Sequence, residues 1–423
     1  MGKFGFVNRL GRTLLYGGNA GKIKRAGRWY IMRTLGTQAK GIRTPIIRQG
    51  DDLVKILTDS LLDSAKTEGY ALNDRDVVGV TEAVVARAQG NYAHVDQIAA
   101  DIRGKFGGGT LGVVFPIMSR NRFSILLKGI AMGAEKVIVQ FSYPSDEVGN
   151  RLVDPEEIYN KKVNPYTDSF DEKGFRDVFG YSTVHRFTGV DYIESYKELY
   201  NNIEVVFSND PAHILKYTSN VLACDIHTRE LTKKKLKDAG AKTVYGLDDI
   251  LSKSKDGSGY NPQYGLLGSN KATEETVKLF PREADVFVNA LQKSLHNATG
   301  KNIDVMVYGD GAFKDPAGGI WELADPVVSP AYTPALDGTT NEIKIKYIAD
   351  NQLKDLSGQS LEQEIKNIIR EKDANLVGNM VSEGTTPRHV VNLLGSLCDL
   401  VTGSGDKGTP MVLVQGYFDN YSV

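Results

Sequence analysis

The stretch from Ile303 to Pro326, IDVMVYGDGAFKDPAGGIWELADP, places chemically active side chains directly after an apolar segment. The apolar residues up to Tyr308 predict a buried strand, and Asp310 follows between two glycines. The loop behind it carries a lysine and three further acids, Lys314, Asp315, Glu322 and Asp325. Carboxylates bind hard divalent cations, and a lysine neutralises phosphate charge. This spacing predicts a Mg²⁺ or Mn²⁺ site that also binds an anion such as phosphate.

A strand end is a plausible place for such a site, because ligands of α/β proteins collect at the carboxyl ends of strands. Asp310 would bind the metal, and its flanking glycines would let phosphate oxygens approach. The alternative is an ordinary surface turn, since glycine and aspartate form turns in many proteins.

The composition is typical of a globular protein and narrows the kinds of metal site and partner to expect. With 423 residues and a formal net charge of -1, we expect two or three domains and no nucleic-acid partner. The cysteines, Cys224 and Cys398, lie far apart, and the six histidines form no close metal-binding pair. We therefore expect no disulfide framework, and we expect a cytoplasmic location. Any bound metal should have oxygen ligands. No apolar run is long enough to span a membrane.

The chain divides by pattern into four segments, and the first is basic. No acid precedes Asp51, so residues 1–43 form an arm that suits a transit peptide, an anionic surface, a second subunit or simple exposure to solvent. The predicted segments are this arm, a unit at 44–110, an α/β region at 111–262 and a C-terminal part at 263–423.

Strand and helix patterns alternate between residues 111 and 262, which predicts a parallel α/β layer. The strands are expected in LGVVFPIM, EKVIVQFSY, IEVVFSN and NVLACDIH, and the helices at 122–134, 192–200 and 229–239. The polar stretch between Tyr143 and Val190 is interpreted as a long functional or mobile loop. In the flanking parts, Asp51 or Asp52 can cap a helix with Leu53, Leu57 and Leu61 on its apolar face. A second helix carries Ala284, Val288, Leu291 and Leu295 on one face.

Nucleotide-binding motifs of the common classes do not fit this chain. GGNAGKIK lacks the spacing and the hydroxyl residue of a P-loop. Two GxGxxG matches start at Gly107 and Gly403, but neither follows a strand and opens a helix. The second could still form a backbone anion nest between a helix and a strand.

Three separated blocks resemble the coenzyme F420-0:L-glutamate ligase (F420-0 γ-glutamyl ligase) family. They are TPIIRQGDDL with DRDVVGVTEAVVARAQGNY, then GLLGSNKATEETVKLFPREADVFVNALQKSLHNATGKNIDVMVYGDG, and finally VVNLLGSLCDLVTGSGDKGTPMVLVQG. The blocks follow the family's order and cover somewhat under half of the chain. Residues from about 111 to 262 have no clear counterpart and look like a large insertion.

The resemblance implies a mixed α/β fold with the extra parallel layer inserted, a homodimer, and GTP or ATP used with Mg²⁺ or Mn²⁺. It implies an enzyme that joins L-glutamate, or a similar amino acid, to a small carboxylate acceptor through an acyl phosphate. It assigns the metal to Asp310, the phosphates to Arg87, and nucleotide binding to Asn270, to Pro45, Ile46, Ile47 and Arg48, and to residues 403–409 with Gly403, Ser404 and Gly405. Together with Lys314 of the loop, Asp310 and Arg87 are the expected catalytic residues. Glu82, Arg87 and Ser269 are also expected to bind the nucleotide. Arg87 stands where a lysine beside the phosphates is expected.

The chain departs from the family pattern around the expected metal site. Leu267 replaces a second metal-binding aspartate, Gly311 a threonine and Ser404 a glutamine. We expect Asp315, Glu322 and Asp325 to restore the metal site, because these acids occur in the same altered loop. The altered loop and the unmatched middle region also indicate an acceptor other than F420-0.

Two other functions remain open at this point. One is a nucleotide-binding regulatory or scaffold protein with a decayed ligase site, which Leu267 and Gly311 favour. The other is a dehydrogenase or transferase that works through the middle layer, which the absent strand–GxGxxG–helix context disfavours.

Overall fold

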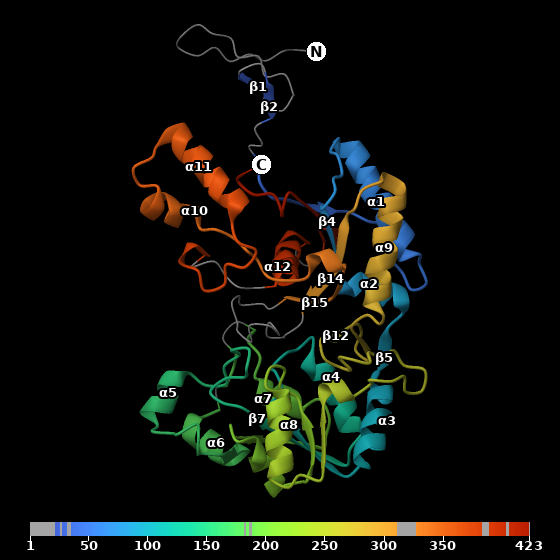
Figure 1. The fold of residues 1–423 in the computed structure, drawn as a ribbon. Coiled ribbons are helices and arrows are strands. Elements are labelled where there is room, and N and C mark those ends of the chain that lie inside the picture. Colours follow the sequence, from blue (N-terminus) through green and yellow to red (C-terminus); the bar gives the residue numbers. More distant parts are fainter. Residues whose placement is uncertain are drawn as a thin grey trace. The chain divides into compact units, whose positions relative to one another are not determined.

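The computed structural model describes most of the chain, and Figure 1 shows its elements. The described residues are 22–25, 28–31, 35–181, 183–185, 188–310, 327–382, 389–402 and 406–422. They belong to two compact units. The larger comprises Ala39–Thr340 and Thr386–Val414, and the smaller comprises Met1–Gln38, Asn341–Thr385 and Gln415–Val423. The mixed α/β class predicted from the sequence is confirmed.

A five-stranded sheet, counted over the described residues, forms the first part of the larger unit. Its strand order is β15–β14–β4–β16–β3. The strands are β15 (Val327–Tyr332), β14 (Asp304–Asp310), β4 (Val77–Thr81), β16 (Met411–Gln415) and β3 (Gln38–Ile42). β14 and β4 are parallel, with Tyr308 opposite Thr81, whereas β15 and β16 run antiparallel to them. The two parallel strands therefore end at the same edge of the sheet.

Helices cover both faces of this sheet: α1 (Leu53–Glu68), α9 (Ala284–Thr299) and α12 (Val390–Thr402). Val305 and Val307 of β14 are buried in one core with the apolar faces of α1 and α9. Tyr308 points to the opposite face, where its hydroxyl donates to Thr402 Oγ1 of α12 (3.1 Å). Alternation along a strand thus assigns α1 and α9 to one face and α12 to the other, as Figure 1 shows.

The two long helices on the first face form where the sequence predicts them. The Asp52 carboxylate accepts from the backbone N–H of Lys55 (3.0 Å) and caps α1, and Gly69 ends it in the left-handed conformation. The predicted apolar positions of both helices are buried: Leu53, Leu57, Leu61, Ala284, Val288, Leu291 and Leu295.

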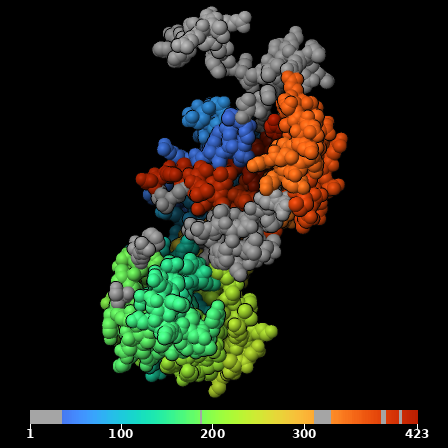
Figure 2. Space-filling model, turned by 90° about the vertical axis from the view of Figure 1, so that its left-hand side faces the viewer, coloured from blue at the N-terminus to red at the C-terminus, as the bar shows by residue number. Residues whose placement is uncertain are grey.

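A six-stranded sheet forms the second part of the larger unit, and it confirms the predicted parallel layer. The strand order is β11–β10–β6–β7–β9–β8, and every neighbouring pair except β8–β9 is parallel. Its strands are β6 (Thr110–Val114), β7 (Lys136–Phe141), β8 (Phe170–Asp171), β9 (Ile203–Phe207), β10 (Asn220–Ala223) and β11 (Thr243–Gly246). Its main helices are α3 (Val95–Phe106), α4 (Phe123–Met132), α7 (Tyr192–Lys197) and α8 (Arg229–Asp238). In Figure 2 this part is the green and yellow-green body.

The stretch between Tyr143 and Val190, interpreted from the sequence as a long loop, contains regular structure. It forms α5 (Pro155–Asn160), β8 and α6 (Glu172–Phe179). Two acidic side chains near the start of this stretch accept hydrogen bonds from distant backbone groups. Asp146 accepts from the backbone N–H of Met118 (2.8 Å), and Glu147 accepts from the backbone N–H groups of Ile226 and His227. The loop interpretation failed because these bonds join segments far apart in sequence, which local composition does not reveal.

A small three-stranded sheet follows the first helix after β4. The helix that directly follows β4 is α2 (Glu82–Gln89). The strand order of the small sheet is β12–β13–β5. Its strands are β12 (Asn270–Lys271), β13 (Thr276–Lys278) and β5 (Tyr92–His94). This sheet brings residues near 270–278 beside the start of α2.

The smaller unit is described by itself. It contains α10 (Ile345–Tyr347) and α11 (Gly358–Glu371), and Ile348, Ile365 and Ile369 are buried together in its core. A two-stranded antiparallel ribbon, β1 (Lys22–Arg25) and β2 (Arg28–Ile31), lies near the start of the chain. Among the described residues, no helix is long and apolar enough to cross a membrane.

Candidate functional site

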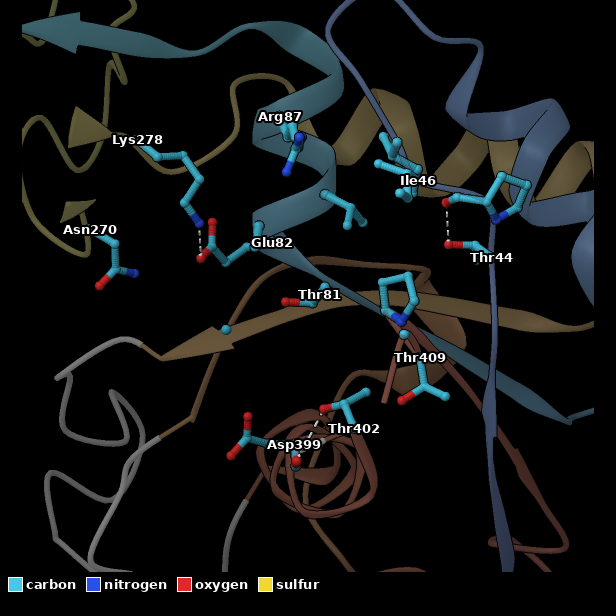
Figure 3. A pocket seen from close by; sticks show the side chains of 17 residues that line it. Thr44, Ile46, Thr81, Glu82, Arg87, Asn270, Lys278, Asp399, Thr402 and Thr409 are labelled. Atoms are coloured by element: carbon cyan, nitrogen blue, oxygen red, sulfur yellow. Dashed lines mark hydrogen bonds and ion pairs between the residues drawn. The ribbon is translucent and has the colours of Figure 1, made fainter. Parts of the chain in front are cut away.

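A cleft of about 700 Å³ opens where the parallel strands β4 and β14 end. The residues that line it come from the loop before α1, from α2, from β12 and β13, and from the end of α12 with the loop after it (Figure 3). They are Thr44, Pro45, Ile46, Ile47, Thr81, Glu82, Ala83, Val84, Arg87, Asn270, Lys278, Gly309, Asp399, Thr402, Gly408, Thr409 and Pro410. The volume suits a nucleotide-sized ligand.

A buried ion pair forms one wall of the cleft. Lys278 Nζ of β13 lies 2.6 Å from Glu82 Oε1, the first residue of α2. The Glu82 side chain is 4% exposed and the Lys278 side chain 11% exposed. Figure 3 shows the lysine reaching across to the carboxylate from a separate segment of the chain. Because both charges are removed from bulk water, each depends strongly on the other.

Gly309 is a glycine because Glu82 occupies the space beside it. A Cβ atom at residue 309 would lie 2.2 Å from Glu82 Cγ, which is far inside van der Waals contact. The sequence-based explanation was that this glycine admits phosphate oxygens. The structure gives a nearer cause, since the strand end must leave room for the Glu82 side chain.

Two further polar side chains face the same part of the cleft. Arg87 lies on the exposed side of α2, and Asn270 begins β12. In Figure 3 the Arg87 guanidinium points toward the part of the cleft that holds the Lys278–Glu82 pair. A cleft with two cationic groups and an amide can bind phosphate oxygens and a polar ring system.

The opposite wall is formed by two loops joined by backbone hydrogen bonds. Thr44 donates from its backbone N–H to Gly408 O (3.3 Å), and Thr81 donates to Pro410 O (3.0 Å). Residues 44–47 and 408–410 are thereby tied to the end of β4. Ile47 is buried and anchors the first loop, while Ile46 is 80% exposed.

Hydroxyl groups and one carboxylate complete this wall. Thr402 Oγ1 receives the Tyr308 hydroxyl hydrogen and donates back into its own helix, to Cys398 O (3.0 Å). Burial raises the pKa of Tyr308, so its phenol stays protonated and acts as the donor. The hydroxyl oxygen of Thr409 is buried and has no hydrogen-bond partner among the described residues. Asp399 of α12 also lines the cleft.

The structure brings together six of the residues assigned from the sequence: Pro45, Ile46, Ile47, Glu82, Arg87 and Asn270. Two others lie elsewhere. Arg48 is exposed outside the cleft lining, where its backbone N–H donates to Asp51 Oδ2 (2.6 Å). Ser269 is buried, and its hydroxyl donates to Leu266 O (2.7 Å).

The remaining assignments lie partly or wholly outside the described residues. The backbone of Asp310 is described, as the last residue of β14 opposite Val327, but its side chain is not. The residues outside the described ranges are Lys314, Asp315, Glu322, Asp325, Gly403, Ser404 and Gly405.

Thr409 of the cleft lies in the stretch 403–409 that the resemblance assigns to nucleotide binding, whereas Lys278, Asp399 and Thr402 are cleft residues that sequence reasoning missed. The sequence around Lys278 does indicate a buried lysine with a partner, because Lys278 lies between the apolar residues Val277 and Leu279. The identity of that partner was not readable, because Glu82 is 196 positions away.

Metal binding can be judged from the oxygen donors of the cleft. No group of three His, Cys, Asp or Glu side chains in the described ranges could hold a metal ion. One Glu82 oxygen is bonded to Lys278, and Leu267 is buried in the core of the six-stranded layer. Mg²⁺ often uses one or two carboxylates together with substrate phosphates. The donor set therefore fits a metal bound together with a nucleotide better than a metal held by protein alone.

Comparison with known proteins adds one match. A family model described as F420-0:Gamma-glutamyl ligase matches residues 41–416. Apart from the first residues of β3, this match includes all three sheets described above for the larger unit, and it includes every described residue of the cleft. No significant match was found among curated proteins.

Proposed function

Because the chain belongs to the F420-0:gamma-glutamyl ligase family, we propose that its cleft forms an amide bond between an amino acid and a carboxylate acceptor. L-Glutamate is the proposed amino acid, and GTP the proposed source of energy, with ATP as the alternative. The observation that carries this proposal is the cleft at the ends of β4 and β14, where Lys278, Glu82 and Arg87 gather.

The chemistry requires activation of a poor electrophile. An acceptor carboxylate oxygen attacks the γ-phosphorus, the bond to the β–γ bridging oxygen breaks, and a nucleoside diphosphate leaves. The amine of glutamate then attacks the carbonyl carbon of the acyl phosphate, loses a proton, and expels inorganic phosphate. Both steps carry negative charge on phosphoryl oxygens, which positioned cations stabilise.

The described residues supply that stabilisation. Lys278 is held by Glu82, so its ammonium is oriented before the substrate arrives. Arg87 adds a second cation whose planar donors suit phosphate, and Asn270 offers an amide for the nucleotide. Glu82 acts here as a positioning residue for Lys278.

A divalent metal is part of the proposal. Asp310 at the end of β14 would hold it, with Asp315, Glu322 and Asp325 as the further candidates in the sequence that follows. When bound, Mg²⁺ or Mn²⁺ would neutralise charge on the transferring phosphoryl group.

Thermal unfolding with GTP, GDP and ATP, each with and without Mn²⁺, tests the proposal on the wild type and on Asp310→Asn. A ligand at roughly 100 times its Kd stabilises a protein by about 2.7 kcal/mol, which is readily measured. We expect a shift with a guanine nucleotide that requires both the metal and Asp310. No shift with any nucleotide under any condition would overturn the proposal.

A nucleotide-binding protein without ligase activity is the second candidate. The buried position of Leu267, in place of a metal-binding aspartate, favours it. Such a protein would give the nucleotide shift but release no phosphate when supplied with L-glutamate and a panel of carboxylic acids. Glutamate-dependent phosphate release would exclude it.

A further inference from the structure

A second, larger cavity adjoins the cleft. This groove has a volume of about 1170 Å³ and lies between α1 on one side and β3 with the loop at 407–409 on the other. The groove and the cleft share three lining residues, Thr44, Pro45 and Thr409. A molecule bound in the groove therefore lies next to the cleft.

The helix wall of the groove is acidic and polar. Asp59, Asp63 and Thr67 are spaced by four residues and form one exposed ridge of α1. Ser60 and Ser64 form the neighbouring ridge. The opposite side of α1 carries its buried leucines, so the helix presents these polar ridges while its apolar face is held in the core.

The strand wall of the groove is basic. Arg43 and Lys407 are exposed there, and Lys40 of β3 lies with its ammonium 5.1 Å from the centre of the Tyr70 ring. Among the described residues, no ion pair joins Arg43 or Lys407 to the acids of α1, and Asp59 pairs instead with Lys55 on its own helix (2.5 Å). Opposite charges thus face each other across the groove without closing it.

The residue between the two cavities has an unused hydrogen-bonding group. The Thr409 hydroxyl oxygen is buried without a partner among the described residues, and Thr409 lines both the groove and the cleft. A buried hydroxyl left without a partner destabilises a protein, so a bound ligand is a natural partner for it.

We propose that this groove binds the amino-acid substrate of the ligase, a zwitterion with a second carboxylate, and delivers its amine to the cleft past Thr409. The proposal rests on the proposed function. The carboxylates lie toward Arg43 and Lys407, and the ammonium lies toward Asp59 and Asp63. The groove is larger than one amino acid, so water bridges part of these contacts.

Three probes separate the contributions of the two walls. L-Glutamate carries the ammonium and both carboxylates, glutarate lacks the ammonium, and 4-aminobutyrate lacks the α-carboxylate. Their dissociation constants are measured by ligand-observed NMR on the full chain with GTP and Mn²⁺ present. The KM for glutamate is measured in parallel from phosphate release.

Wild-type protein should bind L-glutamate at least 10-fold more tightly than either analogue. Arg43→Ala and Lys407→Ala should each weaken glutamate binding about 10-fold. Asp63→Asn should weaken glutamate binding and leave glutarate binding unchanged, so the preference for glutamate over glutarate shrinks. Thr409→Val keeps the side-chain shape and should raise the KM for glutamate. The matched controls are Lys66→Ala on α1 and Asp285→Asn on α9, both exposed outside the groove lining.

The outcomes distinguish this inference from the proposed function. If nucleotide binds but the groove variants leave glutamate binding and its KM unchanged, the groove assignment is wrong while the ligase proposal stands. Failure of the wild type to bind glutamate by NMR, together with no glutamate-dependent turnover, also overturns the assignment. If glutamate binds through Arg43 and Asp63 but no nucleotide binds, the groove assignment stands and the ligase proposal fails.

Discussion

Lys278 Nζ and Glu82 Oε1 lie 2.6 Å apart in a nearly buried ion pair, although their residues are separated by 196 positions. The pair joins β13 to the first turn of α2 in one wall of the cleft. It therefore links the stability of this wall to the charge that the cleft presents to a ligand.

Replacing Lys278 with methionine should destabilise the protein, because it leaves the Glu82 carboxylate buried without its cation. Breaking a buried pair typically costs 3–5 kcal/mol, and we expect a loss of about 3 kcal/mol in the free energy of unfolding. Urea denaturation measures it. The double variant Glu82→Gln/Lys278→Met should recover part of the loss. Lys271→Met, which removes an exposed lysine of β12, should change stability by under about 0.5 kcal/mol. A loss under about 1 kcal/mol in Lys278→Met would contradict the importance of the pair.

Gly309→Ala should displace the Glu82 side chain, because the new methyl group would lie 2.2 Å from Glu82 Cγ. Overpacking of this kind costs about 1–3 kcal/mol. The free energies of unfolding of Gly309→Ala, Glu82→Ala and the double variant form a cycle. The double variant should be less destabilised than the sum of the singles. Simple additivity would mean that the two side chains do not compete for this space.

Arg87→Ala should weaken nucleotide binding about 10-fold and leave stability nearly unchanged, because Arg87 is exposed at the cleft wall. Isothermal titration with GTP and Mn²⁺ measures the effect, and Arg87→Lys should retain part of the affinity. Arg48→Ala is the matched control, since Arg48 lies on the neighbouring loop outside the cleft lining. Equal effects of Arg48→Ala and Arg87→Ala would show that the described cleft is not where the phosphates bind.

Glu147 should make stability fall as pH rises through the weakly acidic range. Burial raises the pKa of Glu147 from 4.5 to about 7, despite the backbone N–H donors of His227 and Ile226. The folded state then binds the proton more tightly than the unfolded chain, so stability is highest below pH 4.5 and is lost up to pH 7. The free energy of unfolding of the wild type, relative to Glu147→Gln, should fall by about 3 kcal/mol between pH 4.5 and pH 7.

The control for this measurement is Glu135→Gln, an exposed glutamate at the start of the β7 segment. Its difference from the wild type should stay constant over the same pH range. A pH-independent difference for Glu147→Gln would mean that Glu147 ionises in the folded protein as it does in the unfolded chain.

Local sequence patterns were enough to predict the long helices of the larger unit, the faces that they bury, and the parallel layer. The spacing of Ala284, Val288, Leu291 and Leu295 predicted a helix and its buried side, and all four are buried in α9. Alternating strand and helix patterns predicted the parallel layer, and the cap of the first long helix was expected at Asp51 or Asp52, of which Asp52 caps α1. These signals are local, because the periods of helices and strands decide which neighbouring residues share a face.

The tertiary structure decided which residues share the cleft. Lys278 meets Glu82 because β13 pairs with β5, which follows α2, and Thr409 lies beside Thr44 because β16 and β3 are neighbours in one sheet. The polar turn after Tyr143 is ordered in the same way, by bonds from Asp146 and Glu147 to distant backbone groups. Such contacts depend on strand order and long-range packing, which local sequence spacing does not encode.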